Sequence, residues 1–252
     1  MVPGVVSLRD SAVRPRVLRR DCAFSIVLIA ALFACSESPA TDPDSAQGAG
    51  GEGGGGAQGA CGDATEQLLS GSGTPLEPLA PLFETSIPDS SCNAVEREFD
   101  LTSAPGPTHV TTCSEIDYVT NPPCLGPHYG TWAAFQNYDA AIPRGFWVHS
   151  LEHGAVVITY SCEDCEDEVA AAKAMIAALP VDPLCSAPVE RRVILTPDRK
   201  LDTRWAASAW GFTLTSECFE ADVFSAFAIS HNAAGPEDFC ANGVDVSRPL
   251  NP

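Results

Sequence analysis

The first 60 residues cannot form part of a packed core, and this confines the fold to the rest of the 252-residue chain. Residues 36–60 are almost entirely small or polar, with the run Gly-Gly-Glu-Gly-Gly-Gly-Gly at 50–56. Such a segment buries too little apolar surface to offset the entropy lost on folding, so we expect a disordered tether. Globular composition begins at Cys61 and continues for a length typical of one domain.

The segment before the tether has the order of an export signal. Four arginines between residues 14 and 20 precede an apolar run from Cys22 to Phe33. The run is too short to cross a bilayer as a helix, and the basic, apolar, small-residue order is that of a secretory signal. Because Leu32-Phe33-Ala34-Cys35 resembles a bacterial lipobox, we expect residues 1–35 to be a lipoprotein-type signal peptide with Cys35 acylated. Phe33 is unusual in that motif and leaves cleavage by an ordinary signal peptidase open.

This interpretation places the protein outside the cytoplasm, anchored to a bacterial membrane in the periplasm or at the cell surface. The chain is also strongly acidic, with 33 Asp and Glu against 14 Lys and Arg and a formal net charge of −19. Such a balance opposes binding to phosphate backbones and to anionic membrane surfaces. We therefore exclude nucleic acid as a partner and expect membrane contact through the lipid anchor only.

Cysteine usage agrees with export. Nine cysteines follow Cys35: Cys61, Cys92, Cys113, Cys124, Cys162, Cys165, Cys185, Cys218 and Cys240. In an oxidising compartment disulfides are the default, and an odd number leaves one thiol unpaired. Spacing alone does not establish the connectivity. Proximity and flanking turns favour pairing Cys113 with Cys124 and Cys218 with Cys240.

The hydrophobic pattern predicts a single α+β domain. Helices are expected over Asp63–Leu69, Glu166–Leu179 and Phe219–Ser230, and extended segments over Glu96–Leu101, His109–Cys113, Ala155–Tyr160, Arg192–Thr196 and Trp205–Thr215. This order favours a small, mostly antiparallel sheet with helices packed on one face. A long Pro-rich loop separates the halves between residues 121 and 144, and such loops are usually functional. We divide the globular part into an N-terminal extension, 61–117, and a core domain, 118–252.

Three of the five histidines lie between residues 128 and 153, and they predict a metal site. Imidazole is the commonest protein ligand for transition metals. We expect His128, on the Pro-rich loop, to join His149 and His153, with Glu152 as a fourth ligand or as support for one. Copper and zinc suit such ligands. The alternative is a non-catalytic structural or interaction module in which these histidines bond loop backbone. Nothing in the pattern singles out His109.

The string His149-Ser150-Leu151-Glu152-His153 also matches the inverted zincin signature of certain metallopeptidases, in which Glu152 would act on metal-bound water. That signature needs a sustained helix. Here Gly145 and Gly154 bracket the motif and a strand follows at once, so we expect a single turn or bend and disfavour the peptidase.

Cys162-Glu163-Asp164-Cys165 lies between a predicted strand and a predicted helix, the context of a thioredoxin-like redox centre. A thiol–disulfide oxidoreductase is therefore the alternative function. Five carboxylates crowd the pair and should raise the thiol pKa that such chemistry needs low. We favour a structural role in which Cys185 forms a disulfide with Cys162 or Cys165.

Residues distributed over 118–237 resemble the domain-of-unknown-function family 3105. They are Tyr118, Pro122-Pro123, Gly126-Pro127-His128-Tyr129, Trp132, Tyr138, the stretch from Val148 to Gly154, Tyr160 and Ala209-Trp210-Gly211. The resemblance implies an extracytoplasmic, often membrane-anchored protein. It also implies that the hallmark positions of the family are His128, His149, Glu152 and His153. It implies no activity. Cys124-Leu125 replaces the small hydroxyl residues usual after Pro-Pro, so a Cys113–Cys124 bridge would substitute for their hydrogen bonds.

Overall fold

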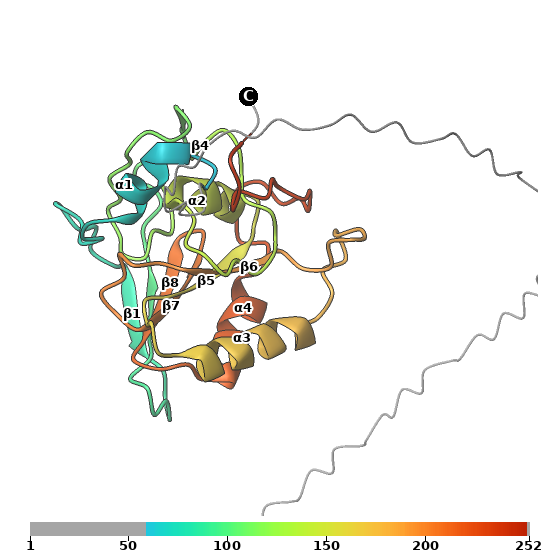
Figure 1. Cartoon of the computed structure of the whole chain (residues 1–252). Helices are drawn as coiled ribbons and strands as arrows, with labels where there is room; N and C mark the ends of the chain where they lie inside the picture. Colours follow the sequence, from blue (N-terminus) through green and yellow to red (C-terminus); the bar gives the residue numbers. More distant parts are fainter. Residues whose placement is uncertain (1–58, 251–252) are drawn as a thin grey trace, which may run out of the picture. The chain divides into compact units, whose positions relative to one another are not determined.

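A six-stranded sheet runs through the computed structural model, which describes residues 59–250 (Figure 1). Its strand order is β1 (Phe83–Ser86), β2 (Val95–Glu98), β8 (Phe212–Ser216), β7 (Trp205–Ala209), β5 (Val156–Tyr160) and β6 (Val193–Pro197). Every neighbouring pair is antiparallel except β5 and β6. The expected α+β class is confirmed. The signal peptide, Cys35 and tether residues 36–58 lie outside the described part of the chain. Gly59 and Ala60 are buried and Ala60 packs in the core, so the expectation of a tether as far as residue 60 is wrong for these two residues.

Helices pack on both faces of this sheet. Val156 and Ile158 of β5 contact the core formed with α3 (Glu166–Ala178) and α4 (Ala221–His231). The intervening Val157 lies in a second core with α2 (Arg144–Glu152), because successive strand side chains point to opposite faces. Figure 1 shows α3 and α4 on one side and α2 on the other. The expectation that the helices pack on one face is therefore correct for α3 and α4, whereas α2 packs on the other face.

A short pair of parallel strands, β3 (His109–Val110) and β4 (His128–Tyr129), lies beside α2. His109 is the register partner of His128. Before these strands come the 3-10 turn η1 (Gly62–Ala64) and helix α1 (Thr65–Leu69), which confirm the first expected helix. The β3–β4 pairing is the part of the fold that positions the site described below.

The helix α2 corrects the expectation of a single turn or bend around His149. All nine of its residues are buried, so it shows no polar face and no helical periodicity. Gly145 is required by packing, because a Cβ there would lie 2.6 Å from the ring of Tyr129. Gly154, at φ 81°, takes the left-handed conformation that follows the end of a helix.

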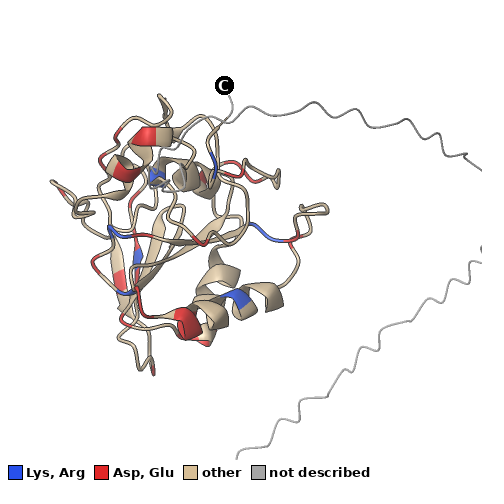
Figure 2. Ribbon diagram, viewed as in Figure 1, with Lys and Arg blue, Asp and Glu red and all other residues tan. Residues whose placement is uncertain are grey.

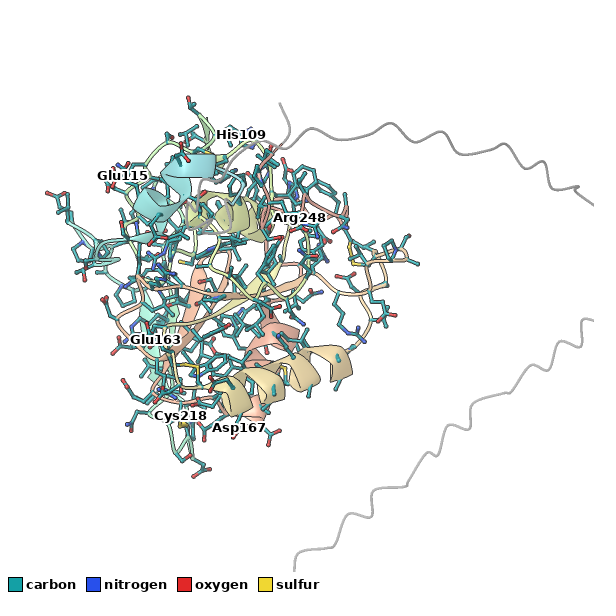
Figure 3. The ribbon with its side chains drawn as sticks, viewed as in Figure 1. His109, Glu115, Glu163, Asp167, Cys218 and Arg248 are labelled. Atoms are coloured by element: carbon teal, nitrogen blue, oxygen red, sulfur yellow. A yellow bond between two sulfur atoms is a disulfide. The ribbon has the colours of Figure 1, made fainter. Side chains whose placement is uncertain are left out.

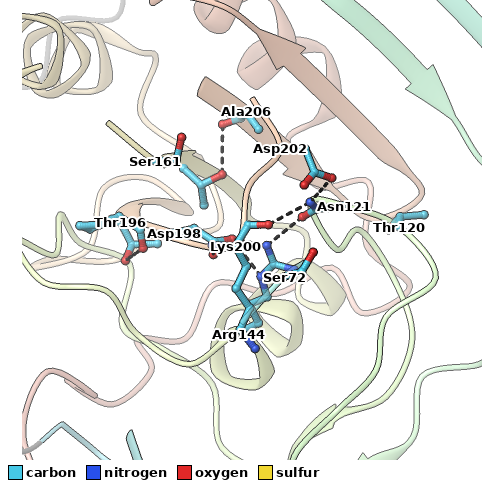
Figure 4. Close-up of polar contacts among 12 residues, drawn as sticks. Ser72, Thr120, Asn121, Arg144, Ser161, Thr196, Asp198, Lys200, Asp202 and Ala206 are labelled. Carbon is cyan, nitrogen blue, oxygen red and sulfur yellow. Dashed lines mark hydrogen bonds and ion pairs between the residues drawn. The ribbon is translucent and has the colours of Figure 1, made fainter. Parts of the chain in front are cut away.

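A buried arginine anchors the first turn of α2 (Figure 4). Arg144 Nε donates to Asp198 Oδ2 at 2.9 Å, and its Nη2 donates to Asn121 Oδ1 at 2.8 Å. Asn121 Nδ2 in turn donates to the Lys200 carbonyl at 3.0 Å and to Asp202 Oδ2 at 2.7 Å. These bonds tie α2 to the Pro-rich loop and to the segment after β6, which fixes where its other end lies.

Four disulfides cross-link the described residues, and they overturn the expected pairings. The pairs are Cys61–Cys113, Cys92–Cys218, Cys162–Cys165 and Cys185–Cys240, and Cys124 is a buried free thiol. The predicted Cys113–Cys124 and Cys218–Cys240 bridges are wrong, and so is a bridge from Cys185 to Cys162 or Cys165. Partners up to 126 residues apart meet because the sheet brings them together, as when β2 and β8 pair beside Cys92 and Cys218.

The disulfides fit an extracytoplasmic protein. Within residues 59–250, no helix combines the length and the apolarity needed to cross a bilayer.

Candidate metal site

The last turn of α2 and the β3–β4 pair bring four ligand-type side chains together. His149 and Glu152 come from α2, His128 from β4 and His109 from β3. Their ligand atoms all lie within 4.8 Å of one another. We call these four residues the histidine cluster. Three of its members are buried, whereas the His109 side chain is 58% exposed, so the cluster reaches the protein surface.

The three imidazoles converge on one carboxylate oxygen. Glu152 Oε2 lies 3.0 Å from His128 Nε2, 3.8 Å from His149 Nε2 and 4.0 Å from His109 Nε2. A tetrahedral site with metal–ligand bonds of about 2.1 Å has edges of about 3.4 Å. The cluster therefore already has the approximate dimensions of one metal ion's ligand shell.

Backbone carbonyls orient the two buried rings. His128 Nδ1 lies 3.0 Å from the Gly126 carbonyl oxygen, and His149 Nδ1 lies 2.6 Å from that of Tyr129. A carbonyl only accepts, so each Nδ1 carries the proton and each Nε2 keeps its lone pair. Metal-bound histidines are commonly held in this way.

Burial keeps these imidazoles neutral. It lowers the pKa of His128 and lowers the pKa of His149 to about 3, with neighbouring histidines adding to the effect. Burial also raises the pKa of Glu152, and the nearby carboxylate of Glu237 raises it further. Neutral imidazole is the form that binds a metal ion. The cluster also lies at the C-terminal end of α2, where the helix dipole favours a positive charge.

His153 belongs to a different group of ligand atoms. It joins Glu152 and Glu237, whose ligand atoms also lie within 4.8 Å of one another. The structure thus brings together His128, His149 and Glu152 of the predicted ligand set, and it places His109 with them where His153 was expected. His109 precedes the first residue of the family resemblance, Tyr118, by nine residues, and it reaches the cluster because β3 pairs with β4. Its position in an extended segment able to pair with the His128 loop was the available signal.

The ligand groups do not favour the metallopeptidase signature, although the ring centroids of His149 and His153 lie 4.7 Å apart. The helix that it needs is present, contrary to expectation, but His149 and His153 do not share either group of ligand atoms. The signature requires both imidazoles on one ion.

The Cys162–Cys165 pair lies elsewhere, at the start of α3. Figure 3 shows His109 near the top of the domain and Asp167, in the first turn of α3, near the bottom. Acidic residues fill the first turn of α3 (Figure 2). Arg204 pairs with Asp164 at 3.0 Å and with Glu168 at 2.8 Å, which offsets part of this negative charge.

Together the fold and the site define a disulfide-bonded α+β domain with a histidine/glutamate cluster that could hold a metal ion. The model of the family described as "Protein of unknown function (DUF3105)" matches residues 109–242. The match covers more than half of the chain, so the chain belongs to this family. It begins at His109 and spans every residue of both ligand groups. No curated protein and no solved structure matches the chain significantly.

Proposed function

We propose that this domain binds a transition-metal ion, copper or zinc, through His109, His128, His149 and Glu152. The supporting observation is the 3.0 Å approach of His128 Nε2 to Glu152 Oε2. With its proton on Nδ1, His128 has no hydrogen to donate here, and this buried Nε2 makes no hydrogen bond. Two lone pairs that face each other at this distance need a positive centre between them.

A metal ion, a proton on Glu152 or a second proton on His128 would supply that positive centre, and burial disfavours the last because it lowers the pKa of His128. The raised pKa of Glu152 makes the proton the physical alternative. A proton would satisfy His128 alone, however, and it would leave His149 and His109 aimed at the same oxygen without a role. A metal ion uses all four groups at once.

Three imidazoles and one carboxylate favour zinc or copper over hard cations, which prefer oxygen ligands. The exposed ring of His109 provides the entry path for an ion from solvent. The proposed role is to bind or handle the ion. Hydrolysis with Glu152 as the base for metal-bound water is a bolder extension. In this arrangement Glu152 is itself a candidate ligand, and a carboxylate bound to the ion is not free to act as the base.

Location completes the proposal. Export directed by residues 1–35, with acylation of Cys35 and a tether over residues 36–58, would hold the domain at the outer side of a bacterial membrane. The metal site would then meet ions outside the cytoplasm.

The test is metal binding by the purified protein without a histidine tag. Wild type should take up zinc or copper at micromolar concentrations, measured by mass spectrometry and by competition with a chromophoric chelator. His128→Ala should weaken binding at least about 100-fold, since even outer-shell changes cost 10- to 100-fold. His231→Ala is the matched control, because His231 contacts Glu96 outside the cluster. A wild-type protein that takes up neither ion would contradict the proposal. A proton on Glu152 would then be the remaining explanation of its contact with His128.

A thiol–disulfide oxidoreductase remains the second candidate, favoured by one observation. Cys162 and Cys165 form a disulfide between β5 and the first turn of α3, the context of such enzymes. Counting free thiols before and after mild reduction tests it. A Cys162–Cys165 bond that resists gentle reductant removes this candidate.

A further inference from the structure

We infer that Glu152, His153 and Glu237 form a second metal site, so that Glu152 bridges two ions. The inference rests on the proposed function, because Glu152 is shared with the histidine cluster. The second site would take a second zinc ion, held more weakly than the first.

His153 has the environment of a ligand rather than of a structural histidine. Its side chain is 2% exposed, its Nε2 lies 3.3 Å from Glu237 Oε2, and its Nδ1 is buried without a hydrogen-bond partner. The rings of Trp132 and Phe239 pack against it, at centroid distances of 4.5 and 4.1 Å. An ion on Nε2 would give Nδ1 no partner, so the second site rests on the approach of Nε2 to Glu237 and on the ligand distances shared with Glu152.

Glu237 is placed by the backbone rather than by chance. Its N–H donates to the Glu152 carbonyl oxygen at 2.9 Å, and the N–H of Ala233 donates to that of Gly154 at 2.9 Å. Gly235 lies so close to the end of α2 that a Cβ there would overlap the Glu152 carbonyl oxygen. The Cys185–Cys240 bridge holds the same segment from its far side. Glu237 is therefore built onto the helix end that carries Glu152 and His153.

The chemistry of a carboxylate allows the sharing. Oε2 of Glu152 faces the three histidines of the first site, and a carboxylate has a second oxygen. Paired metal sites in proteins hold their ions about 3.5–4 Å apart. Both ligand groups lie at the C-terminal end of α2, where the helix dipole favours cations.

The charges around the second site also permit a cation. Arg192 is the nearest positive group, since its Nη1 donates to the His153 carbonyl oxygen at 2.9 Å. Its charge is balanced by Asp182 and Asp238, each at 2.7 Å. One imidazole and two carboxylates make a poorer zinc site than three imidazoles, and the Glu237 side chain is 54% exposed. The second ion should accordingly bind more weakly.

The experiment is a zinc titration of the full chain with stoichiometry read by mass spectrometry and by chelator competition. Wild type should bind about two equivalents at saturation. Glu237→Gln should bind about one, with the affinity of the remaining equivalent within about threefold of that of the first wild-type equivalent. Glu152→Gln should weaken both equivalents at least about tenfold, because the bridge serves both ions. Glu77→Gln, at an exposed position away from α2, is the matched control.

The outcomes separate the two proposals. Uptake of neither zinc nor copper by wild type contradicts the proposed function itself. If wild type binds a single equivalent of zinc and His128→Ala loses it, the proposed function is supported and the second site is overturned. If Glu237→Gln still binds two equivalents of zinc, the second site is likewise overturned. Because Glu237 is at the surface, the variant should unfold at the wild-type temperature without metal. Copper(II) gives an independent readout by electron paramagnetic resonance. Magnetic coupling between two neighbouring copper ions should reduce the signal per ion in wild type but not in Glu237→Gln.

Discussion

Two regions of this domain place metal- or redox-type side chains three or four residues apart at a helix end. The histidine cluster lies at the C-terminal end of α2, and Cys162–Cys165 lies at the N-terminal end of α3. The dipole of α2 favours the cation that the histidines would bind. The dipole of α3 would favour a thiolate, but Glu166, Asp167 and Glu168 in its first turn oppose one.

Burial separates the two regions further. His128, His149 and Glu152 are at most 7% exposed, and apolar rings such as Trp132 and Trp210 pack around them. The residues between Cys162 and Cys165 are exposed and charged. Spacing along the chain therefore indicates a candidate site, whereas burial and neighbouring charge decide which chemistry that site supports.

The largest expected contrast concerns zinc affinity. His128→Ala should weaken binding of the first equivalent at least about 100-fold, or about 2.8 kcal/mol. Replacing Cys162 and Cys165 by serine should change it less than about twofold. Isothermal titration of the three proteins measures the difference. A large loss of zinc binding in the serine variant would mean that the two regions are coupled.

Acid should destabilise the protein through its buried imidazoles. Burial lowers the pKa of His149 to about 3 and of His153 to about 4, against about 6.5 in the unfolded chain. Between these values the unfolded chain binds more protons, so stability is fully present above pH 6.5 and is lost as the pH falls. The loss should be about 1 kcal/mol per pH unit for each histidine.

Urea unfolding of the metal-free protein at pH 7, 6 and 5 measures this loss, above the range in which most carboxylates titrate. The raised pKa of Glu152 works in the opposite direction but concerns one group. His149→Gln should flatten the profile. A stability independent of pH over this range would show that these rings are hydrated and already titrate normally.

Removing the Cys162–Cys165 bridge should lower the free energy of unfolding by only about 2 kcal/mol, because this bridge closes a very short loop. Removing Cys92–Cys218, which joins positions 126 residues apart, should cost about 5 kcal/mol by the same loop-closure argument and serves as the positive control. Thermal and urea unfolding of the paired serine variants provide the values. If loss of Cys162–Cys165 leaves stability unchanged, a structural role for this bond is wrong and the redox candidate gains support.

The smallest expected effect decides between the two histidine sets. His153→Ala should alter the affinity of the first zinc equivalent by less than about threefold, whereas His109→Ala should weaken it at least about tenfold. His109 is exposed, so its removal should scarcely change the fold. The reverse order of effects would restore the ligand set expected from the sequence.

Much of the regular structure was predictable. The segments that became β5, α3, β6 and α4 carry clear periodicity or β-branched runs. Three elements were missed, and one of them is the short strand β4 within the segment expected to be a Pro-rich loop. The other two were missed for physical reasons. Helix α2 is buried on all sides and shows no polar face. Strand β1 is exposed at all four positions, at the edge of the sheet, and shows no alternation.

Residue types and their order along the chain predict an acidic, cysteine-rich α+β domain in which His128, His149, His153 and Glu152 are ligand candidates. The folded arrangement is needed to show that His109 joins His128, His149 and Glu152, that His153 faces Glu237, and which cysteines pair. The reason is that local patterns depend on neighbours along the chain. Ligand sets and disulfides depend instead on strand pairing and packing between segments that lie tens of residues apart.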